Sequence, residues 1–368
     1  MKTIINLLGL MLIALLLMGA CNNEKGFKVG VIAPLTGDGA RYGEAMKYGI
    51  DMAIEEINST GGFQNQKIIA VYQDDKFNPK VALNGFSYLR DVAHVPIIFG
   101  PAGSGISKIL SSHANESKIV LLSSISTSDT LSFAGEYFFR NISANSMAAK
   151  TVSNFLTNEL KLKNVGVFYE NNEYGINMNK VFKETFIQGN IVFNLSYEFG
   201  QTDFKSSILS ISKKNIDAIF IQGTTKNIAI ITKQLRENKI DCPIITGDGG
   251  YGDEIKNIAG SAANGLYCTL PAIEDTLTTN YVVFKEKFYN NYKKLPDVYS
   301  VLSYDAVMMV FNSIMEEKGE ITGELIRNKL MQTTYLGLGG EYKFDSNGDV
   351  DKPFFIFQYN EGVYKQIK

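Results

Sequence analysis

Short runs of β-forming residues alternate with amphipathic helical segments along nearly the whole chain. "KVGVIAPL" at 28–35 predicts a buried strand, and 44–58 repeats apolar residues at steps of three and four, as one face of a helix does. The same alternation restarts after "YFFRNISANS" at 137–146. Because strands separated by helices of ~10–15 residues form βαβ units, the sequence predicts an α/β fold with two doubly wound parallel-sheet domains.

In doubly wound sheets, ligands bind at the carboxyl ends of the strands, where loops meet the first turns of helices. The loops after the predicted strands are 36–43, 101–105, 123–128, 170–175, 223–226 and 247–252. They are rich in hydroxyl groups and glycine and poor in catalytic groups. Ser104 is a poor candidate for a nucleophile, because it lacks the G-x-S-x-G context and a histidine at a strand end to act as its base.

The N-terminus predicts export. Lys2 is the only charge before the apolar run 4–18, which ends in Met18-Gly19-Ala20-Cys21, as a signal peptide at 1–20 does. Small residues directly before a cysteine indicate a lipoprotein, cleaved ahead of Cys21 and anchored to a membrane through that thiol. A plain secretory signal stays open, whereas the run is shorter than the ~20 residues of a membrane span.

Without the first 20 residues the chain has 348 residues, 35 basic and 38 acidic, which fits two domains and argues against a nucleic-acid surface. Cys242 and Cys268 lie near successive predicted strands and could pair in an oxidising compartment. His94 and His113 stand apart from any Cys or carboxylate cluster, so we expect no metal site there.

The acidic run from Asp345 to Asp351 hints at calcium, but it lacks the glycine at the sixth position and the closing glutamate of an EF-hand. Its "DSNGD" lies between the strand-like runs "GEYKF" and "KPFFIFQY". We therefore predict a hairpin turn carried by Asn347-Gly348.

The loop 247–252 carries glycines at G-x-G-x-x-G spacing, yet its context argues against a dinucleotide site. It follows the last strand of its βα series, and Asp248 lies inside it, where a pyrophosphate would be repelled. An acid at a strand end can instead hold an ammonium group. Ser104 and the hydroxyls of 123–128 could cradle a carboxylate, although the same residues also serve as plain helix caps. Together these groups match both charges of an α-amino acid.

The chain resembles the periplasmic leucine/isoleucine/valine-type binding proteins, the substrate-binding subunits of amino-acid ABC importers. The resemblance covers essentially the whole mature chain. The motifs that carry it, in the family's order, are "KVGVIAPLTGDGARYGEAMKYGIDMAIEEINSTGG", "YQDDKFNPKVA", "IIFGPAGSG", "VLLSSISTS", "YENNEYG", "DFKSSILSI" and "IAGSAANGLYCTLP". It implies the type I periplasmic-binding-protein fold, in which a three-segment hinge joins the two domains, and no cofactor.

The resemblance also implies a set of ligand-binding residues, namely Tyr42, Ser104, Ile125, Thr127, Tyr174, Thr224, Asp248 and Tyr299. Ser104 would bind the ligand carboxylate through its hydroxyl, and Ile125 and Thr127 would share the carboxylate and the ammonium. Asp248 would close on the ammonium. Thr224 replaces a tyrosine often found in the family, which removes one polar contact and widens the pocket.

The expected domains are an N-terminal lobe of 27–141 plus 272–335 and a C-terminal lobe of 142–271 plus 336–368. We expect a monomeric, extracytoplasmic lipoprotein that closes on an amino acid and delivers it to ABC permease subunits. The alternative is a subunit that binds an amide or an aromatic or other small carboxylic acid, for uptake or sensing. Asp248 discriminates between them, because a neutral amide gains nothing from its charge.

Overall fold

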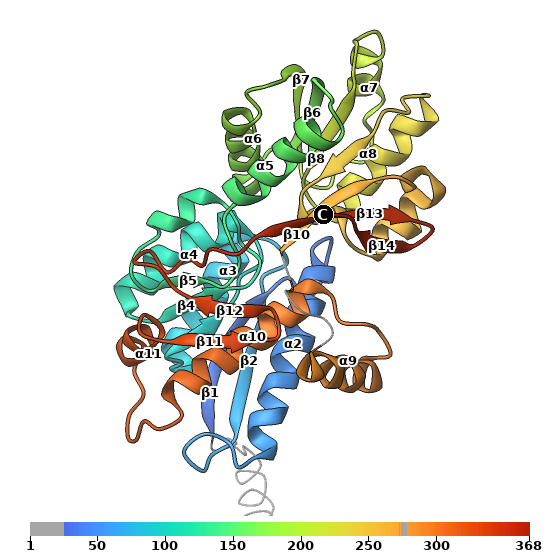
Figure 1. Ribbon diagram of the computed structural model, residues 1–368. Helices are drawn as coiled ribbons and strands as arrows, with labels where there is room; N and C mark the ends of the chain where they lie inside the picture. Colours follow the sequence, from blue (N-terminus) through green and yellow to red (C-terminus); the bar gives the residue numbers. More distant parts are fainter. Residues whose placement is uncertain (1–25, 272, 274–277) are drawn as a thin grey trace, which may run out of the picture.

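Two lobes, each built on a parallel sheet, lie one above the other in the computed structural model, which describes residues 26–271, 273 and 278–368 (Figure 1). The signal segment 1–20 and Cys21 lie outside the described residues. The first lobe contains a parallel sheet of order β2-β1-β3-β4-β5. Its strands are β1 (Phe27–Ala33), β2 (Ile68–Asp74), β3 (Ile97–Phe99), β4 (Val120–Ser123) and β5 (Phe138–Arg140).

The sheet of the second lobe has the order β14-β13-β10-β9-β8-β6-β7. Five of its strands are parallel and repeat the 2-1-3-4-5 order of the first lobe, and β13 and β14 add an antiparallel edge. The predicted pair of doubly wound sheets is confirmed. The strands are β6 (Asn164–Glu170), β7 (Asn190–Tyr197), β8 (Ala218–Gln222), β9 (Ile244–Thr246), β10 (Tyr267–Pro271), β13 (Phe354–Asn360) and β14 (Val363–Gln366).

Most helices of the first lobe bury their apolar faces against its sheet, whereas α9 (Thr279–Tyr292) packs its aromatic residues on two other helices, through Tyr48 and Tyr304. Asn78 caps the second helix of the lobe, accepting hydrogen bonds from the backbone of Lys80 and Val81 ahead of Pro79 at the first helical position. Gly49 permits close contact between two of the helices, because a Cβ there would lie 2.1 Å from the carbonyl oxygen of Ser300 on α10 (Val298–Ile314). The helices are α2 (Ala40–Ser59), α3 (Pro79–Tyr88), α4 (Ser104–Ser117), α9 (Thr279–Tyr292), α10 (Val298–Ile314) and α11 (Gly323–Leu330).

Four further helices cover the second sheet. Asn172 caps α6 by accepting a hydrogen bond from the backbone of Gly175, which fixes the start of that helix at the carboxyl end of β6. The helices are α5 (Asn145–Asn154), α6 (Glu173–Thr185), α7 (Lys205–Ile211) and α8 (Thr225–Glu237).

The chain passes between the lobes three times: from β5 to α5, from β10 to α9, and from the hairpin β11 (Thr334–Gly337) and β12 (Gly340–Lys343) to β13. The predicted boundary at 335/336 falls inside β11, and the domain limits remain a prediction. The third passage is tied to the first lobe by Arg140, which is fully buried and donates two hydrogen bonds to Asp349, at 2.6 and 2.9 Å.

The predicted hairpin at Asn347-Gly348 is wrong, although the turn itself exists. Gly348 has a φ of +76° and its backbone donates to the carbonyl of Asp345. The flanking strands do not pair with each other, because β12 pairs with β11 and β13 pairs with β10 and β14. The acidic run therefore turns the chain toward the other sheet.

Cys242 and Cys268 are both free, so the pairing that the sequence allowed is not formed. The register of the sheet gives the reason. Cys268 on β10 lies opposite Thr246 of β9, whereas Cys242 precedes Thr246 by four residues. At ~3.3 Å per residue this offset is about 13 Å, while the Cα atoms of a disulfide lie within ~7 Å.

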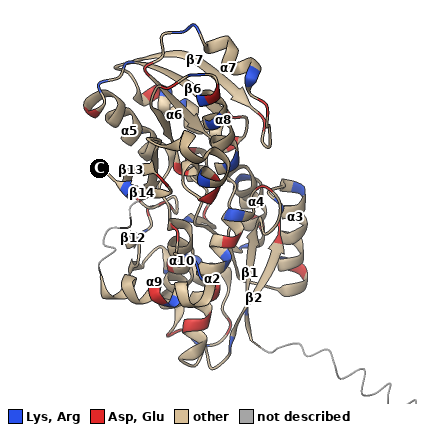
Figure 2. Cartoon of the chain, turned by 90° about the vertical axis from the view of Figure 1, so that its right-hand side faces the viewer, with Lys and Arg blue, Asp and Glu red and all other residues tan. Residues whose placement is uncertain are grey.

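Acidic and basic residues are interspersed along the chain in both lobes (Figure 2). Among the described residues, no helix has both the length and the hydropathy needed to cross a membrane. Within the same residues, no three His, Cys, Asp or Glu side chains gather in a way that could hold a metal ion.

Candidate functional site

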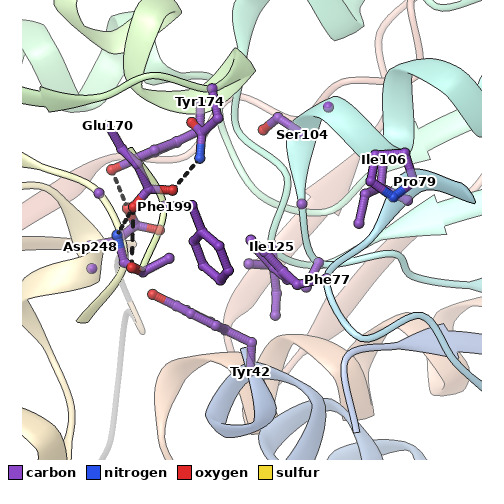
Figure 3. A pocket seen from close by; sticks show the side chains of 17 residues that line it. Tyr42, Phe77, Pro79, Ser104, Ile106, Ile125, Glu170, Tyr174, Phe199 and Asp248 are labelled. Atoms are coloured by element: carbon purple, nitrogen blue, oxygen red, sulfur yellow. Dashed lines mark hydrogen bonds between the residues drawn. The ribbon is translucent and has the colours of Figure 1, made fainter. Parts of the chain in front are cut away.

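A cavity of about 230 Å³ lies between the lobes, at the carboxyl ends of the strands of both sheets (Figure 3). Six of the eight residues predicted from the sequence line it, and Thr127 and Tyr299 do not. The lining residues are Tyr42, Phe77, Pro79, Ala102, Gly103, Ser104, Gly105, Ile106, Ile125, Glu170, Asn172, Tyr174, Phe199, Gly223, Thr224, Asp248 and Gly249.

Asp248 is the acid at the end of β9 and is buried, with 7% of its surface exposed. Tyr174 donates a hydrogen bond of 2.9 Å to its Oδ1, and Tyr299 donates one of 2.6 Å to its Oδ2. Burial raises the pKa of Asp248, and the two tyrosine hydrogen bonds oppose that rise. Since a carboxylate accepts about four hydrogen bonds, both oxygens retain capacity for a donor in the cavity.

The glycines around Asp248 make room for protein groups. A Cβ at Gly249 would lie 2.0 Å from the carbonyl oxygen of Gly223, and one at Gly252 would lie 2.3 Å from the Nε of Arg41. Gly252 also has a φ of +145°, which side chains rarely adopt. The spacing that resembles a dinucleotide motif therefore serves close packing of the loop.

Hydroxyl groups of the first lobe lie across the cavity from Asp248. Ser104 begins α4, is 4% exposed, and accepts a hydrogen bond of 3.3 Å from the backbone of Ser128. The Oγ1 of Thr127 is buried and has no hydrogen-bond partner among the described residues. The Ser123 side chain accepts hydrogen bonds from the backbone of Ile125 and Ser126, which fixes the loop in place. This side of the site can donate hydrogen bonds to an anion.

The other predicted residues form hydrogen bonds that stabilise the walls of the cavity. Tyr42 on α2 hydrogen bonds with Thr225 of the second lobe at 3.2 Å, and burial raises the pKa of Tyr42 to about 12. Tyr299 on α10 is fully buried and contacts the site through its hydrogen bond to Asp248 and through its ring, which lies 5.6 Å from that of Tyr42. Thr224 precedes α8, and its backbone and hydroxyl both donate to Glu170, at 3.0 and 3.1 Å.

Glu170 is a lining residue that the sequence analysis did not single out. Its burial raises its pKa, and the hydrogen bonds from Thr224 oppose that rise. Asn172 donates a hydrogen bond to the other carboxylate oxygen of Glu170, so both oxygens already accept hydrogen bonds from protein groups. The position of Glu170 at the end of a predicted strand, inside "YENNEYG", was the sequence feature that could have identified it as a site residue. Phe77 and Phe199 were also missed: Phe77 lies inside the quoted "YQDDKFNPKVA" without having been singled out, and Phe199 lies between the quoted motifs.

Arg41 connects the two lobes beside the cavity. Its guanidinium lies 5.1 to 5.7 Å from the ring centres of Tyr42, Tyr251 and Tyr299, as cation–π contacts do. It also lies 3.5 Å from Asp297 and 3.8 Å from Glu254. Because Tyr251 and Glu254 belong to the second lobe, the contacts of Arg41 with these two residues form only when the lobes are together.

Asp75, directly after β2, gives the protein a pH dependence of its own. Burial raises the pKa of Asp75 from 3.8 to about 6, and its Oδ2 has no partner among the described residues. The folded protein therefore favours the protonated form of Asp75. The contribution of this protonation to the free energy of unfolding is lost as the pH rises through about 6. Asp75→Asn is expected to be more stable than the wild type by about 3 kcal/mol at pH 7.5 and nearly equal to it at pH 4. Urea unfolding at both pH values, with exposed Asp241→Asn as the control, checks this; a constant difference would contradict it.

Comparison with known proteins adds three findings. Over residues 26–363 the chain matches the family described as periplasmic binding protein. It is 23% identical over 338 residues to the leucine-, isoleucine-, valine-, threonine- and alanine-binding protein of Pseudomonas aeruginosa, which covers 91% of this chain and 90% of that protein. The branched-chain amino acid transporter substrate binding protein LivJ of Streptococcus pneumoniae, solved with isoleucine, aligns with a TM-score of 0.87 at 28% identity, over 93% of this chain and 98% of that chain.

The same fold also occurs with another kind of ligand. A solute binding protein of an ABC transporter from R. palustris, solved with benzoate, aligns with a TM-score of 0.85 at 20% identity, over 93% of this chain and 96% of that chain. At this identity the likeness shows the fold alone.

Proposed function

The chain belongs to the periplasmic binding protein family, and we propose that it is the substrate-binding component of an ABC importer that closes on an α-amino acid between its lobes. The family predicted from the sequence is confirmed, and membership implies a location outside the cytoplasm. One observation carries the proposal: buried Asp248 of one lobe and buried Ser104 of the other line the same cavity. The acid would hold the ammonium and the Ser104 hydroxyl the carboxylate.

The rest of the cavity favours an apolar side chain. Phe77, Ile106, Ile125 and Phe199 line it, and contact with such groups stabilises a ligand that brings apolar surface out of water. The Pseudomonas and Streptococcus relatives bind or are solved with branched-chain amino acids, which supports the same class here. Ligand binding would shift an equilibrium between open and closed lobes.

A thermal-shift screen tests this proposal most directly. The purified chain is heated with each of the twenty amino acids, with small amides, and with benzoate and related acids. A ligand present at 100 times its Kd adds about 2.7 kcal/mol to the free energy of unfolding, so one apolar amino acid should raise the Tm by several degrees. A rise only with amides or aromatic acids would reject the amino-acid assignment.

The second candidate is a small aromatic acid, which the benzoate-bound structure of the same fold favours. Such a ligand has a carboxylate for Ser104 and no ammonium for Asp248. Binding of benzoate by Asp248→Asn as strongly as by the wild type, with no binding of amino acids by either protein, would support this candidate.

We further propose that the mature chain begins at acylated Cys21, acts as a monomer and delivers its ligand to ABC permease subunits in the membrane. The small residues before Cys21 support the anchor. Mass spectrometry of the protein from membranes should show a lipid on Cys21, and Cys21→Ser should release it into the soluble fraction. A soluble wild type cleaved at another position would contradict the anchor.

Gly252 offers a test of closure. In Gly252→Ala the new Cβ would lie 2.3 Å from the Nε of Arg41, so either Arg41 must move or the lobes must stay apart. The variant is expected to bind the amino acid about tenfold more weakly in calorimetry. Gly265→Ala is the control, because Gly265 also has a positive φ, +84°, but has open space beside it. Equal weakening in both variants would assign the effect to backbone strain instead of closure.

A further inference from the structure

Two phenylalanines, one from each lobe, stack over the cavity. Phe77 lies in the loop between β2 and α3, and Phe199 lies in the loop between β7 and α7. Their ring centres are 5.5 Å apart and their planes are within 24° of parallel. Both rings line the cavity and project into it (Figure 3).

The first lobe holds Phe77 in an unfavourable backbone conformation. Phe77 has a φ of +56°, and Lys76 before it has a φ of +52°. Left-handed backbone is unusual for a bulky aromatic residue and persists only where the surroundings enforce it. Here the buried carboxylate of Asp75 does so, accepting a hydrogen bond of 2.8 Å from the backbone of Phe77.

Space for the Phe77 ring is left by a glycine on a neighbouring loop. A Cβ at Gly39 would lie 2.8 Å from the Cδ2 of Phe77, so any side chain there would push the ring away. The Phe77 ring also stacks on Tyr42, with centres 6.3 Å apart and planes within 21°. Phe77 therefore has a stacked aromatic neighbour in each lobe, Tyr42 in the first and Phe199 in the second.

The second lobe presents Phe199 without burying it. Phe199 is 41% exposed, and its loop is fixed by the backbone of Gly200, which donates to Asn227 at 3.3 Å. An ion pair between Lys226 and Asp38 of the first lobe, at 2.8 Å, lies beside the same loop, because a Cβ at Gly200 would be 3.6 Å from Asp38. The contact between Phe199 and Phe77 thus exists only when the lobes are together.

We infer that Phe77 and Phe199 form an aromatic clasp that covers the ligand side chain on closure and makes the protein prefer large apolar amino acids over small ones. This inference rests on the proposed function. A large apolar side chain gives both rings a surface to cover, whereas a small one leaves a gap beneath them that forfeits contacts. A charged side chain would lose its water under the same rings without gaining a partner from them.

The test is the ratio of two Kd values, measured by calorimetry in each variant: alanine against the tightest-binding large apolar amino acid. Phe199→Ala is expected to lower this ratio about tenfold, by weakening the large ligand much more than alanine. Phe77→Leu should lower it in the same direction while avoiding an empty space beside Tyr42. Phe133→Ala, at an exposed phenylalanine remote from the cavity lining, is the matched control and should leave the ratio unchanged.

The two proposals fail in different ways. An unchanged ratio in Phe199→Ala and Phe77→Leu would overturn the clasp, and so would equal weakening of both ligands. If the wild type bound none of the twenty amino acids, the proposed function would fail. The clasp would then be tested with the ratio of the Kd for acetate to the Kd for benzoate, which should fall in the same two variants. A Tm within a few degrees of the wild type confirms that each variant is folded.

Discussion

Asp248→Asn is expected to weaken binding of the amino acid by a factor of about 150 to 5,000. The substitution removes the charge and keeps the size, so the ligand ammonium would be buried without its counter-charge, a loss of about 3–5 kcal/mol by comparison with broken buried ion pairs. Tyr174 and Tyr299 already hold the carboxylate in place, so the wild-type site needs little rearrangement to receive the ammonium. Calorimetric Kd values for the two proteins measure the effect.

The pH dependence of ligand binding distinguishes the effect of the Asp248 charge from the effect of its size and shape. Burial raises the pKa of Asp248, so the carboxyl becomes protonated as the pH falls and the wild type loses affinity. The asparagine variant has no such group and should bind equally weakly at all pH values. Asp253→Asn, at an exposed acid five residues further on, should bind as the wild type does. Wild-type affinity in Asp248→Asn at neutral pH would reject the role of Asp248.

Asp349→Ala is expected to lower the free energy of unfolding by about 3–5 kcal/mol. Arg140 is fully buried and donates to both carboxylate oxygens of Asp349, so the variant leaves a buried guanidinium without its counter-charge. Arg140 also donates to the carbonyl of Ser128, at 2.8 Å, next to Thr127. Ligand affinity should therefore fall together with stability. Urea unfolding monitored by circular dichroism gives the difference.

A second ion pair supplies the control for this prediction. Arg327 and Glu136 lie 2.9 Å apart, but their side chains are 29% and 74% exposed. Because solvent screens such a pair, Glu136→Ala should cost less than about 1 kcal/mol. Equal and small losses in the two variants would show that the Arg140–Asp349 pair contributes no more than a surface contact.

The fold was predictable because its signal repeats along the chain. Each βα unit carries its own periodicity, and the two series imply two sheets whatever the detail of any one strand. Asp248 and Ser104 were predictable for the same reason, since the end of a parallel strand is a defined place in such a sheet. Both lie at the cavity, as expected.

Other features depend on contacts that no local pattern encodes. The run "GEYKF-DSNGD-KPFFIFQY" has the pattern of a hairpin, yet its two strands join different sheets. Phe77 sits in "DDKFNP", where the sequence pattern does not predict a left-handed aromatic residue; the hydrogen bond to buried Asp75 and the packing against Gly39 and Tyr42 hold it there. Likewise, the separation of Cys242 from Cys268 follows from strand register, which spacing along the chain does not determine.

The late return of the chain to its first sheet has a consequence for biosynthesis. Helix α10 (Val298–Ile314) packs against α2 (Ala40–Ser59), and its residues are almost all buried. The first lobe therefore cannot complete its core until synthesis has reached the last fifth of the chain. During translation the nascent polypeptide therefore remains incompletely folded until α10 emerges.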